Sequence, residues 1–148
     1  MEIKFKIKRF NELSLSELYE VLKLRSEVFV VEQNCVYLDI DGKDEKALHV
    51  LGMFGEELVA YARIFKPGDY FEEASIGRVL VKQIYRNKKW GYDLMNEAIR
   101  TTATVLNETQ ITISAQLYLQ QFYKNVGFVR TSDEYLEDAI PHIEMKKK

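Results

Sequence analysis

A short apolar strand that runs into a basic turn and then into a helix constrains this chain more than any other feature. The strand ends at Val79-Leu80-Val81, and the polar turn over residues 82–89 leads to a helix expected to begin near Trp90. The first turn of a helix leaves backbone N–H groups without intrahelical partners, and the helix dipole adds partial positive charge there. The stretch therefore predicts an anion site suited to a phosphate. A solvated basic loop that caps an ordinary helix is the competing interpretation.

Length, charge and cysteine content narrow the class of protein. The chain has 148 residues and a formal net charge of −2, so we expect one domain over residues 1–148 and no basic field for nucleic acid. The apolar run Val28-Phe29-Val30-Val31 is far too short to cross a membrane. Cys35 is the only cysteine, which excludes an internal disulfide, and the alternating start shows no secretory signal. We expect a cytoplasmic monomer or homodimer with no membrane or nucleic-acid partner.

Strand and helix signals alternate along the chain in the order β-α-β-β-β-α-β-α-β-β. Apolar residues alternate with lysines over residues 3–8, which predicts a half-buried strand. Ser14 followed by Glu17 is a capping-box pattern at the start of a helix. Gly127 is placed to end a helix over residues 118–125 in a left-handed conformation.

The middle of the chain predicts how the strands are arranged. Apolar runs over residues 47–54 and 58–65 flank a turn at Gly55, which is a hairpin signal. The strands over residues 75–81 and 110–115 flank the long helix, so we expect them to be parallel. The alternation predicts an α/β fold, a mixed central sheet of six to seven strands with helices on both faces.

The segment Arg86-Asn87-Lys88-Lys89-Trp90-Gly91 resembles the acyl-CoA pyrophosphate loop of the GNAT N-acetyltransferases, Q/R-x-x-G-x-G/A. The first and last positions match, and Lys89 replaces the middle glycine. The resemblance implies that the backbone amides from Arg86 to Tyr92 hold a pyrophosphate. If position 89 needs a positive φ, its lysine carries a steric cost, but it also adds a cation beside the phosphates.

A second segment, residues 122–128, reads F-Y-x-x-x-G-F and resembles motif B of the same family. It closes a helix and opens a strand downstream of the loop, in the family's order. The resemblance implies that Tyr123 protonates the departing thiolate, which a phenol can do. A packing role is the alternative for Tyr123, whereas Phe122 and Phe128 are expected in the core.

The resemblance narrows to the ElaA-type branch of the family in four segments, residues 24–35, 39–44, 115–116 and 140–143. In that branch the helix containing Val28-Phe29-Val30-Val31-Glu32-Gln33 and the loop after it are implied to wall the acceptor pocket. The charged loop from Asp39 to Lys46 is then either a solvated acidic loop or an acidic rim that attracts a cationic amine.

Together these resemblances imply the GNAT fold and an acetyl-CoA-dependent N-acetyltransferase. The acetyl group would pass to a primary amine, on a small molecule or a peptide, by direct attack in a ternary complex. The residues implied at the cofactor are Val79, Leu80, Val81, Arg86, Asn87, Lys88, Lys89, Trp90, Gly91, Tyr92 and Gln116.

Glu32, Asp41 and His142 are expected at the acceptor and are the candidates for a general base. The two histidines and one cysteine lie too far apart in the sequence to show metal-ligand spacing, so no metal is expected. Two alternatives remain open: a non-catalytic acyl-CoA-binding or sensing module, and a protein-interaction domain without a cofactor.

Overall fold

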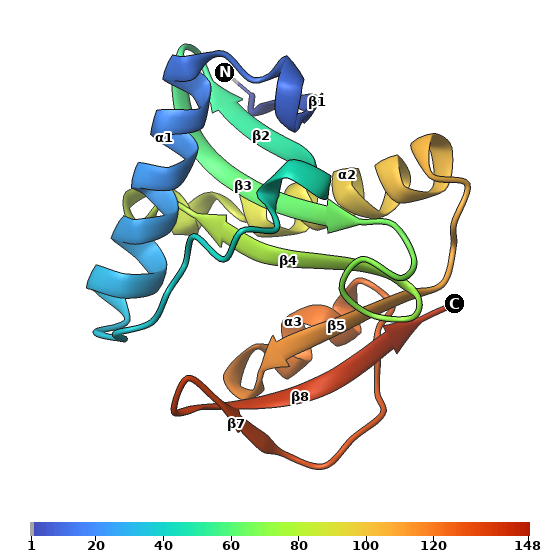
Figure 1. Cartoon of the computed structure of the whole chain (residues 1–148). Helices are drawn as coiled ribbons and strands as arrows, with labels where there is room; N and C mark the ends of the chain where they lie inside the picture. Colours follow the sequence, from blue (N-terminus) through green and yellow to red (C-terminus); the bar gives the residue numbers. More distant parts are fainter. Residues whose placement is uncertain (1) are drawn as a thin grey trace.

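The protein is built on one mixed eight-stranded sheet, seen in a computed structural model that describes residues 2–148 (Figure 1). The strand order is β1-β2-β3-β4-β5-β8-β6, and β7 also pairs with β8. The strands are β1 (Lys4–Arg9), β2 (Leu48–Phe54), β3 (Glu57–Phe65), β4 (Ala74–Val81), β5 (Ile111–Gln116), β6 (Val129–Arg130), β7 (Tyr135–Glu137) and β8 (Ile140–Lys147).

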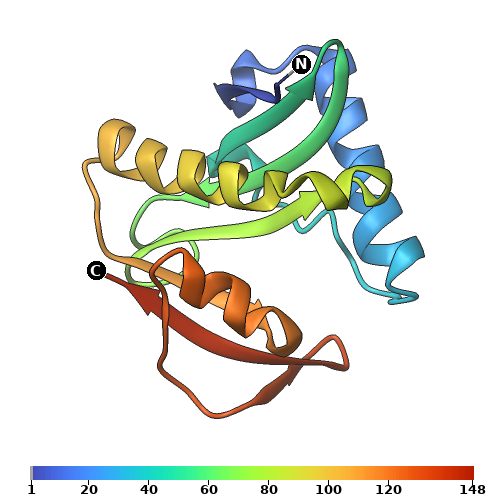
Figure 2. The same ribbon diagram turned by 180° about the vertical axis from the view of Figure 1, so that it is seen from behind.

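Helices cover both faces of the sheet. In Figure 1 α1 lies in front of the sheet, whereas Figure 2, turned to the other side, shows α2 and α3 in front. The helices are α1 (Leu15–Arg25), the π-helical segment η2 (Ser26–Glu32) that continues it, α2 (Trp90–Val105) and α3 (Gln120–Asn125). The 3₁₀ segments are η1 (Phe10–Glu12), η3 (Asp44–Lys46), η4 (Gln83–Lys88) and η5 (Leu117–Leu119).

This architecture confirms the expected α/β class and helix placement. The sheet has eight strands rather than six or seven, because β7 was not anticipated. That strand has only three residues, too few to show an alternating pattern.

The local signals read from the sequence are present in the structure. The backbone N–H of Glu17 donates to Ser14 Oγ over 3.1 Å, and the N–H of Ser14 donates to Glu17 Oε1 over 2.9 Å, completing the capping box. After α3, Gly127 has a φ of 103°, and the N–H of Phe128 donates to the carbonyl of Tyr123 over 3.0 Å. This turn is the glycine-ended motif expected there.

The sheet opens between β4 and β5. These strands are parallel, as expected, but pair only at Ala74 with Ile111 and at Ser75 with Thr112. Beyond those pairs they diverge toward their C-terminal ends (Figure 1). After Ser75, the edge of β4 that faces β5 is therefore not paired with it.

A bulge in β4 accompanies this divergence. Gly77 pairs with Arg63 but Leu80 pairs with Tyr61, so β4 contains one more residue than β3 over this interval. Arg78 lies in the bulge with a φ of 50°, which is uncommon for a residue other than glycine. Bulges bend a strand and redirect its side chains. Here the bulge lies where β4 leaves β5.

Two apolar clusters lie on the two sides of the sheet. The larger joins residues of β2, β3, β5 and β8 to the inner faces of α2 and α3. The smaller joins Val21, Leu24 and Val28 of the first helical stretch to side chains of β2, β3 and β4. The predicted apolar stripes of α1 and α2 therefore face the sheet.

Buried arginines hold the loop between α1 and β2 against the sheet. Arg25 is fully buried, and its guanidinium lies 2.9 Å from Asp39 and 2.7 Å from Asp44. Arg63 of β3 lies 2.9 Å from the same Asp44 oxygen. Buried charges persist only when they are paired and hydrogen-bonded, so these contacts fix the loop's path.

The third aspartate of the loop, Asp41, completes this group. Arg63 donates to both of its carboxylate oxygens over 2.9 Å, and Arg78 lies 3.5 Å away. Burial opposes ionisation of Asp41, but the hydrogen bonds and charge of Arg63 outweigh it and lower its pKa to about 2. We call the six residues Arg25, Asp39, Asp41, Asp44, Arg63 and Arg78 the arginine–aspartate cluster.

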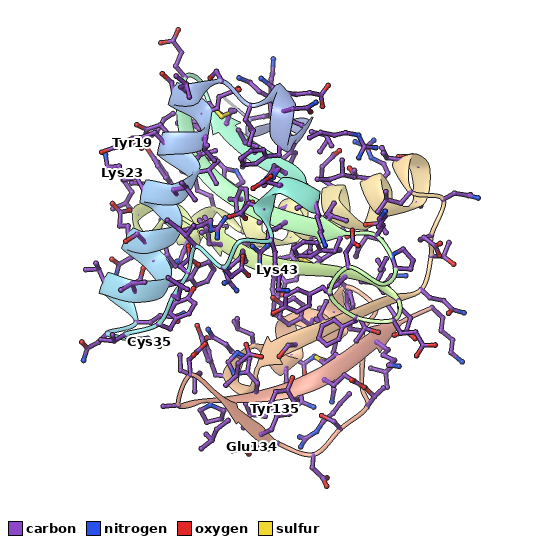
Figure 3. All side chains as sticks on the ribbon, in the orientation of Figure 1. Tyr19, Lys23, Cys35, Lys43, Glu134 and Tyr135 are labelled. Carbon is purple, nitrogen blue, oxygen red and sulfur yellow. The ribbon has the colours of Figure 1, made fainter. Side chains whose placement is uncertain are left out.

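Replacing Arg25 with Met should destabilise the protein by about 3 kcal/mol, the lower end of the range for breaking a buried ion pair. The destabilisation should be no larger than this, because Asp39 and Asp44 keep Arg78 and Arg63 as ion-pair partners. Lys23→Met is the matched control, because Lys23 is exposed on the same helix and points away from the molecule (Figure 3). It should change stability by less than about 0.5 kcal/mol. Urea unfolding measures both, and equal midpoints would contradict the expectation.

Candidate active site

A cavity of about 470 Å³ lies between the diverging strands β4 and β5. Residues 76–81 of β4 form one wall, and Ser114 and Gln116 of β5 contribute to the other. The end of η2 and residues Cys35 and Tyr37 lie along the cavity as well. A cavity of this size, with mixed apolar and polar walls, has the dimensions of a small-molecule site.

The start of α2 closes one end of this cavity. Lys89, Gly91 and Tyr92 line it, and Lys89 has a φ of 61°, in the left-handed region. A Cβ on Gly91 would lie 3.3 Å from Phe122, so α2 approaches α3 closely at this point. The leading N–H groups and the dipole of a 16-residue helix therefore face the cavity beside a lysine.

Arg86 contributes a second cation at this end, already paired with Glu32 across the cavity. The guanidinium donates to both carboxylate oxygens of Glu32, through Nη1 to Oε2 and through Nη2 to Oε1 over 2.8 Å. It also donates through Nε to the carbonyl of Val81 over 2.9 Å. The Arg86 side chain is 41% exposed, so it can attract an incoming anion while it stays paired with Glu32.

Tyr123 lies at the cavity with a nearly buried side chain. Its residue is 7% exposed, and its ring packs edge-on against Phe122 at 5.1 Å and Phe128 at 6.0 Å between centroids. Burial raises the pKa of the Tyr123 hydroxyl, with a smaller contribution from Tyr118. The hydroxyl therefore keeps its proton at neutral pH.

The segment that ends η2 crosses the cavity and contacts its other side. Gln116 donates to Gln33 Oε1 over 3.3 Å, and Cys35 Sγ lies 3.5 Å from the carbonyl of Asp138. π-Helical turns occur often at functional sites, where they displace the following residues from the α-helical register. The η2 segment thereby carries Glu32 and Gln33 over the opening.

The turn between β7 and β8 forms the end of the cavity remote from α2. Glu137, Asp138, Ile140 and His142 line it there. Figure 3 shows Tyr135 on β7, on the lower side of this end of the molecule, and Cys35, just after the first helical stretch, on the upper side. The remote end therefore carries carboxylates and an imidazole, whereas the α2 end carries cations.

Most residues predicted from the sequence meet at this one cavity. Its lining includes Glu32, Val79, Leu80, Val81, Arg86, Lys89, Gly91, Tyr92, Gln116, Tyr123 and His142. Residues separated by more than 100 positions in the chain are thus brought together.

Four predicted residues do not line the cavity. Asp41 is held by Arg63 in the arginine–aspartate cluster, so the acidic loop is neutralised and does not form the rim considered above. Asn87 is exposed, and the ammonium of Lys88 lies 5.7 Å from the centre of the Trp90 ring. Trp90 is 7% exposed because its ring packs in the core against Phe54 and Tyr85.

Several lining residues carried no signal that we recognised in the sequence. In the sequence Arg78 looks like an ordinary strand residue. Its left-handed conformation arises from the bulge, which is defined only by the pairing of β4 with β3. Ser114 lies in a β-branched run, and Glu137 in the short strand β7. The side chain of Glu137 reaches the cavity only because β7 pairs with β8 at Ile140.

Comparison with known proteins identifies the family. A model of the acetyltransferase (GNAT) domain matches residues 15–148. The chain belongs to the GNAT acetyltransferase family. This confirms the resemblance read from the loop at residues 86–91 and from the segment at residues 122–128.

Individual relatives agree with the ElaA-type resemblance. Protein ElaA of Escherichia coli (strain K12) is 46% identical over 140 residues, which cover 93% of this chain and 92% of that protein. The crystal structure of E. coli ElaA matches with a TM-score of 0.92 at 43% identity, covering 99% of this chain and 100% of the other. An acyl-CoA N-acyltransferase from Pseudomonas aeruginosa matches with a TM-score of 0.93 at 37% identity and the same coverage. The GNAT fold is therefore shown for the whole described chain.

Two searches of the described residues give negative results. No helix within residues 2–148 combines the length and apolar character needed to cross a bilayer. Over the same residues, no three His, Cys, Asp or Glu side chains are grouped so that they could hold a metal ion.

Lys89 stands where the GNAT loop usually has glycine, and its left-handed backbone should make Lys89→Gly stabilising. Relief of the steric cost, less the greater flexibility of glycine in the unfolded chain, should raise the free energy of unfolding by about 0.5–1 kcal/mol. Lys88→Gly is the control, because Lys88 lies in η4 and has no positive φ. It should lower stability by a similar amount. Urea unfolding compares them, and a loss of stability in both variants would refute strain at Lys89.

Proposed function

We propose that this protein transfers an acetyl group from acetyl-CoA to a primary amine by direct attack in a ternary complex. The observation that carries the proposal is the cavity between β4 and β5, which runs from the cationic start of α2 past Tyr123 to His142. A single opening thus offers an anion site, a proton donor and a polar acceptor end.

The α2 end fits the pyrophosphate of acetyl-CoA. The first turn of α2 offers backbone N–H groups, Lys89 and Arg86 add charge, and Gly91 leaves its position against Phe122 free of a side chain. In this proposal Asn87, Lys88 and Trp90 act through the backbone of the turn rather than through their side chains. Phosphate binding at a helix start needs only these elements.

The open edge of β4 fits the amide-rich arm of the same cofactor. Residues 76–81 of β4 line the cavity and have left their pairing with β5, so Val79, Leu80 and Val81 can offer main-chain groups to a ligand. An extended amide chain can pair with such an edge as an added strand does. Gln116, at the end of β5, would face the arm from the other side.

The chemistry then rests on positioning and on Tyr123. The amine nitrogen forms a bond to the thioester carbon, and the C–S bond breaks to release the thiolate of CoA. The protonated Tyr123 hydroxyl supplies the proton that this thiolate takes. The acceptor ammonium loses two protons in becoming the amide: one passes through a base to solvent, and the other restores the proton of Tyr123. Amide, thiol and one released proton are therefore the products. Holding both reactants in one cavity supplies the effective concentration.

The acceptor would enter at the end remote from α2, where His142 lines the cavity. Glu32 would lie between the two substrates, although its carboxylate already neutralises Arg86. Asp41 would act there only indirectly, by fixing Arg63 and Arg78. A primary amine fits the carboxylates and imidazole at this end better than an anionic acceptor does.

Acetyl-CoA should raise the melting temperature, because a ligand that binds only the folded state stabilises it, by about 2.7 kcal/mol at a hundred times its dissociation constant. Arg86→Gln combined with Lys89→Gln should reduce this shift by removing both cations that line the α2 end. Lys88→Gln is the control and should keep most of the shift, since Lys88 lies over Trp90. Thermal melts with and without acetyl-CoA decide the matter; an unchanged shift in the double variant places the phosphates elsewhere.

Tyr123→Phe should lower kcat by about ten- to a thousand-fold, the usual contribution of a general acid. The thermal shift with acetyl-CoA should be retained, because the ring packing against Phe122 and Phe128 does not involve the hydroxyl. Thiol release from acetyl-CoA with a panel of primary amines gives kcat. Tyr19→Phe is the control, because Tyr19 is exposed on α1 and does not line the cavity, and it should change kcat little. Wild-type turnover in Tyr123→Phe would assign Tyr123 to packing alone.

Cofactor binding without thiol release by the unmodified protein would favour a sensing module.

A further inference from the structure

A chain of hydrogen bonds at the remote end of the cavity ends on Glu137. Ser114 Oγ donates to Glu137 Oε1 over 3.1 Å. The Tyr135 hydroxyl lies 2.5 Å from the same Ser114 oxygen. Because the serine has one proton and gives it to Glu137, Tyr135 must donate to Ser114. Two hydroxyls in series thus orient the Glu137 carboxylate through Oε1 and leave its second oxygen, Oε2, for another partner.

The other oxygen faces His142, whose tautomer the structure determines. Nδ1 of His142 lies 2.7 Å from the carbonyl oxygen of Ile140, which can only accept, so Nδ1 carries the proton. In the neutral ring Nε2 therefore has a lone pair, and it lies 3.4 Å from Glu137 Oε2. His142 is buried, and the Tyr135 ring stacks on its imidazole at 6.2 Å between centroids and 23° between planes.

In the neutral form of the ring, His142 Nε2 and the Glu137 carboxylate oxygen Oε2 are both hydrogen-bond acceptors, 3.4 Å apart. This pair of atoms is suited to a ligand that brings N–H donors and positive charge. The side chain of His142 is 8% exposed and lines the cavity, whereas that of Glu137 is 43% exposed.

In the described part of the chain, Glu137 is not neutralised by a lysine or an arginine. Within residues 2–148, no lysine or arginine lies within ion-pair distance of it. The nearby Arg78 is committed to the arginine–aspartate cluster, with Nε 2.8 Å from Asp39. Glu32, by contrast, is paired with Arg86. Of these two glutamates on the cavity wall, only Glu137 offers uncompensated negative charge to a substrate.

We propose that Glu137 Oε2 and His142 Nε2 together bind the ammonium group of the acceptor, and that His142 Nε2 takes its proton. This inference rests on the proposed function and names the subsite and the base for that reaction. One N–H of the ammonium donates to Glu137, and a second donates to His142. The second N–H bond breaks, an Nε2–H bond forms, and the electron pair stays on the amine nitrogen, which then attacks the thioester.

The surroundings of His142 favour the ring that results. The imidazolium has a hydrogen-bond acceptor at each nitrogen, the carbonyl of Ile140 at Nδ1 and Glu137 at Nε2. Glu137 thereby exchanges one cationic partner, the ammonium, for another, the imidazolium. The subsite selects cationic primary amines over neutral alcohols, which bring one donor and no charge.

The test follows the His142 ring nitrogens by ¹⁵N NMR while n-butylammonium chloride is added, with butan-1-ol as the uncharged control. It is run with and without CoA, so that it depends neither on turnover nor on the cofactor. The free protein should show Nδ1 protonated and Nε2 unprotonated. n-Butylammonium should shift the Nε2 resonance in a saturable way, and butan-1-ol should not.

Glu137→Gln and Glu134→Gln form the matched pair of variants. Glu134 precedes β7 and is exposed, on the outer side of the same hairpin (Figure 3). Glu137→Gln should weaken the n-butylammonium titration by about ten- to a hundred-fold, the usual loss of one charge-assisted hydrogen bond, while Glu134→Gln leaves it unchanged. Equal melting temperatures of the two variants exclude a fold defect.

Kinetics separates the two roles with the best amine of the panel. Glu137→Gln should mainly raise KM for the amine, and His142→Gln should mainly lower kcat. An unprotonated Nδ1 in the free protein, an n-butylammonium affinity that is unchanged in Glu137→Gln, or no Nε2 shift with n-butylammonium would each overturn the inference. Those results leave the proposed function standing, because the thermal shift with acetyl-CoA and thiol release test it separately.

Discussion

The bulge at Arg78 is the constraint on which the site depends. A residue with a side chain in the left-handed region costs roughly 1 kcal/mol or more, and it persists only where its surroundings hold it. Here Asp39 and Asp41 bind the Arg78 guanidinium, at 2.8 and 3.5 Å. With the bulge in place, β4 leaves β5 after Ser75, and the cavity opens between them. An ion pair outside the cavity thereby supports a strained backbone inside it.

The arginine–aspartate cluster also explains how an acidic loop can lie beside the proposed amine site without forming it. Three arginines from α1, β3 and β4 meet three aspartates of one loop, so the group is neutral as a whole. Its energetic return is modest, since buried ion pairs largely offset their own desolvation. What it supplies is position: the segment before Asp39, including Tyr37 and Cys35, is held along the cavity wall.

Charge is divided along the cavity in a way that matches two substrates of opposite sign. Arg86, Lys89 and the start of α2 lie at one end, and Glu137 with His142 lies at the other. Tyr123 adds no charge to either end, because burial raises the pKa of its hydroxyl. An anionic cofactor and a cationic amine would each be attracted to its own end, with their reactive groups meeting in the middle.

The sequence alone determined most of the helices and strands and the strand–turn–helix at the α2 end of the cavity, because these depend on local chemistry. The capping box at Ser14, the turn at Gly127 and the strand–turn–helix around Trp90 are set by neighbouring residues, and each was found where it was predicted. Tertiary structure decided the rest. Asp41 reads as a pocket residue until Arg63, 22 positions away, takes both of its oxygens. Glu137 reads as an ordinary surface carboxylate until the β7–β8 pairing sets it against Ser114 and His142. Which charges are paired, and which stay free for a substrate, depends on distances between remote segments, and those exist only once the chain has folded.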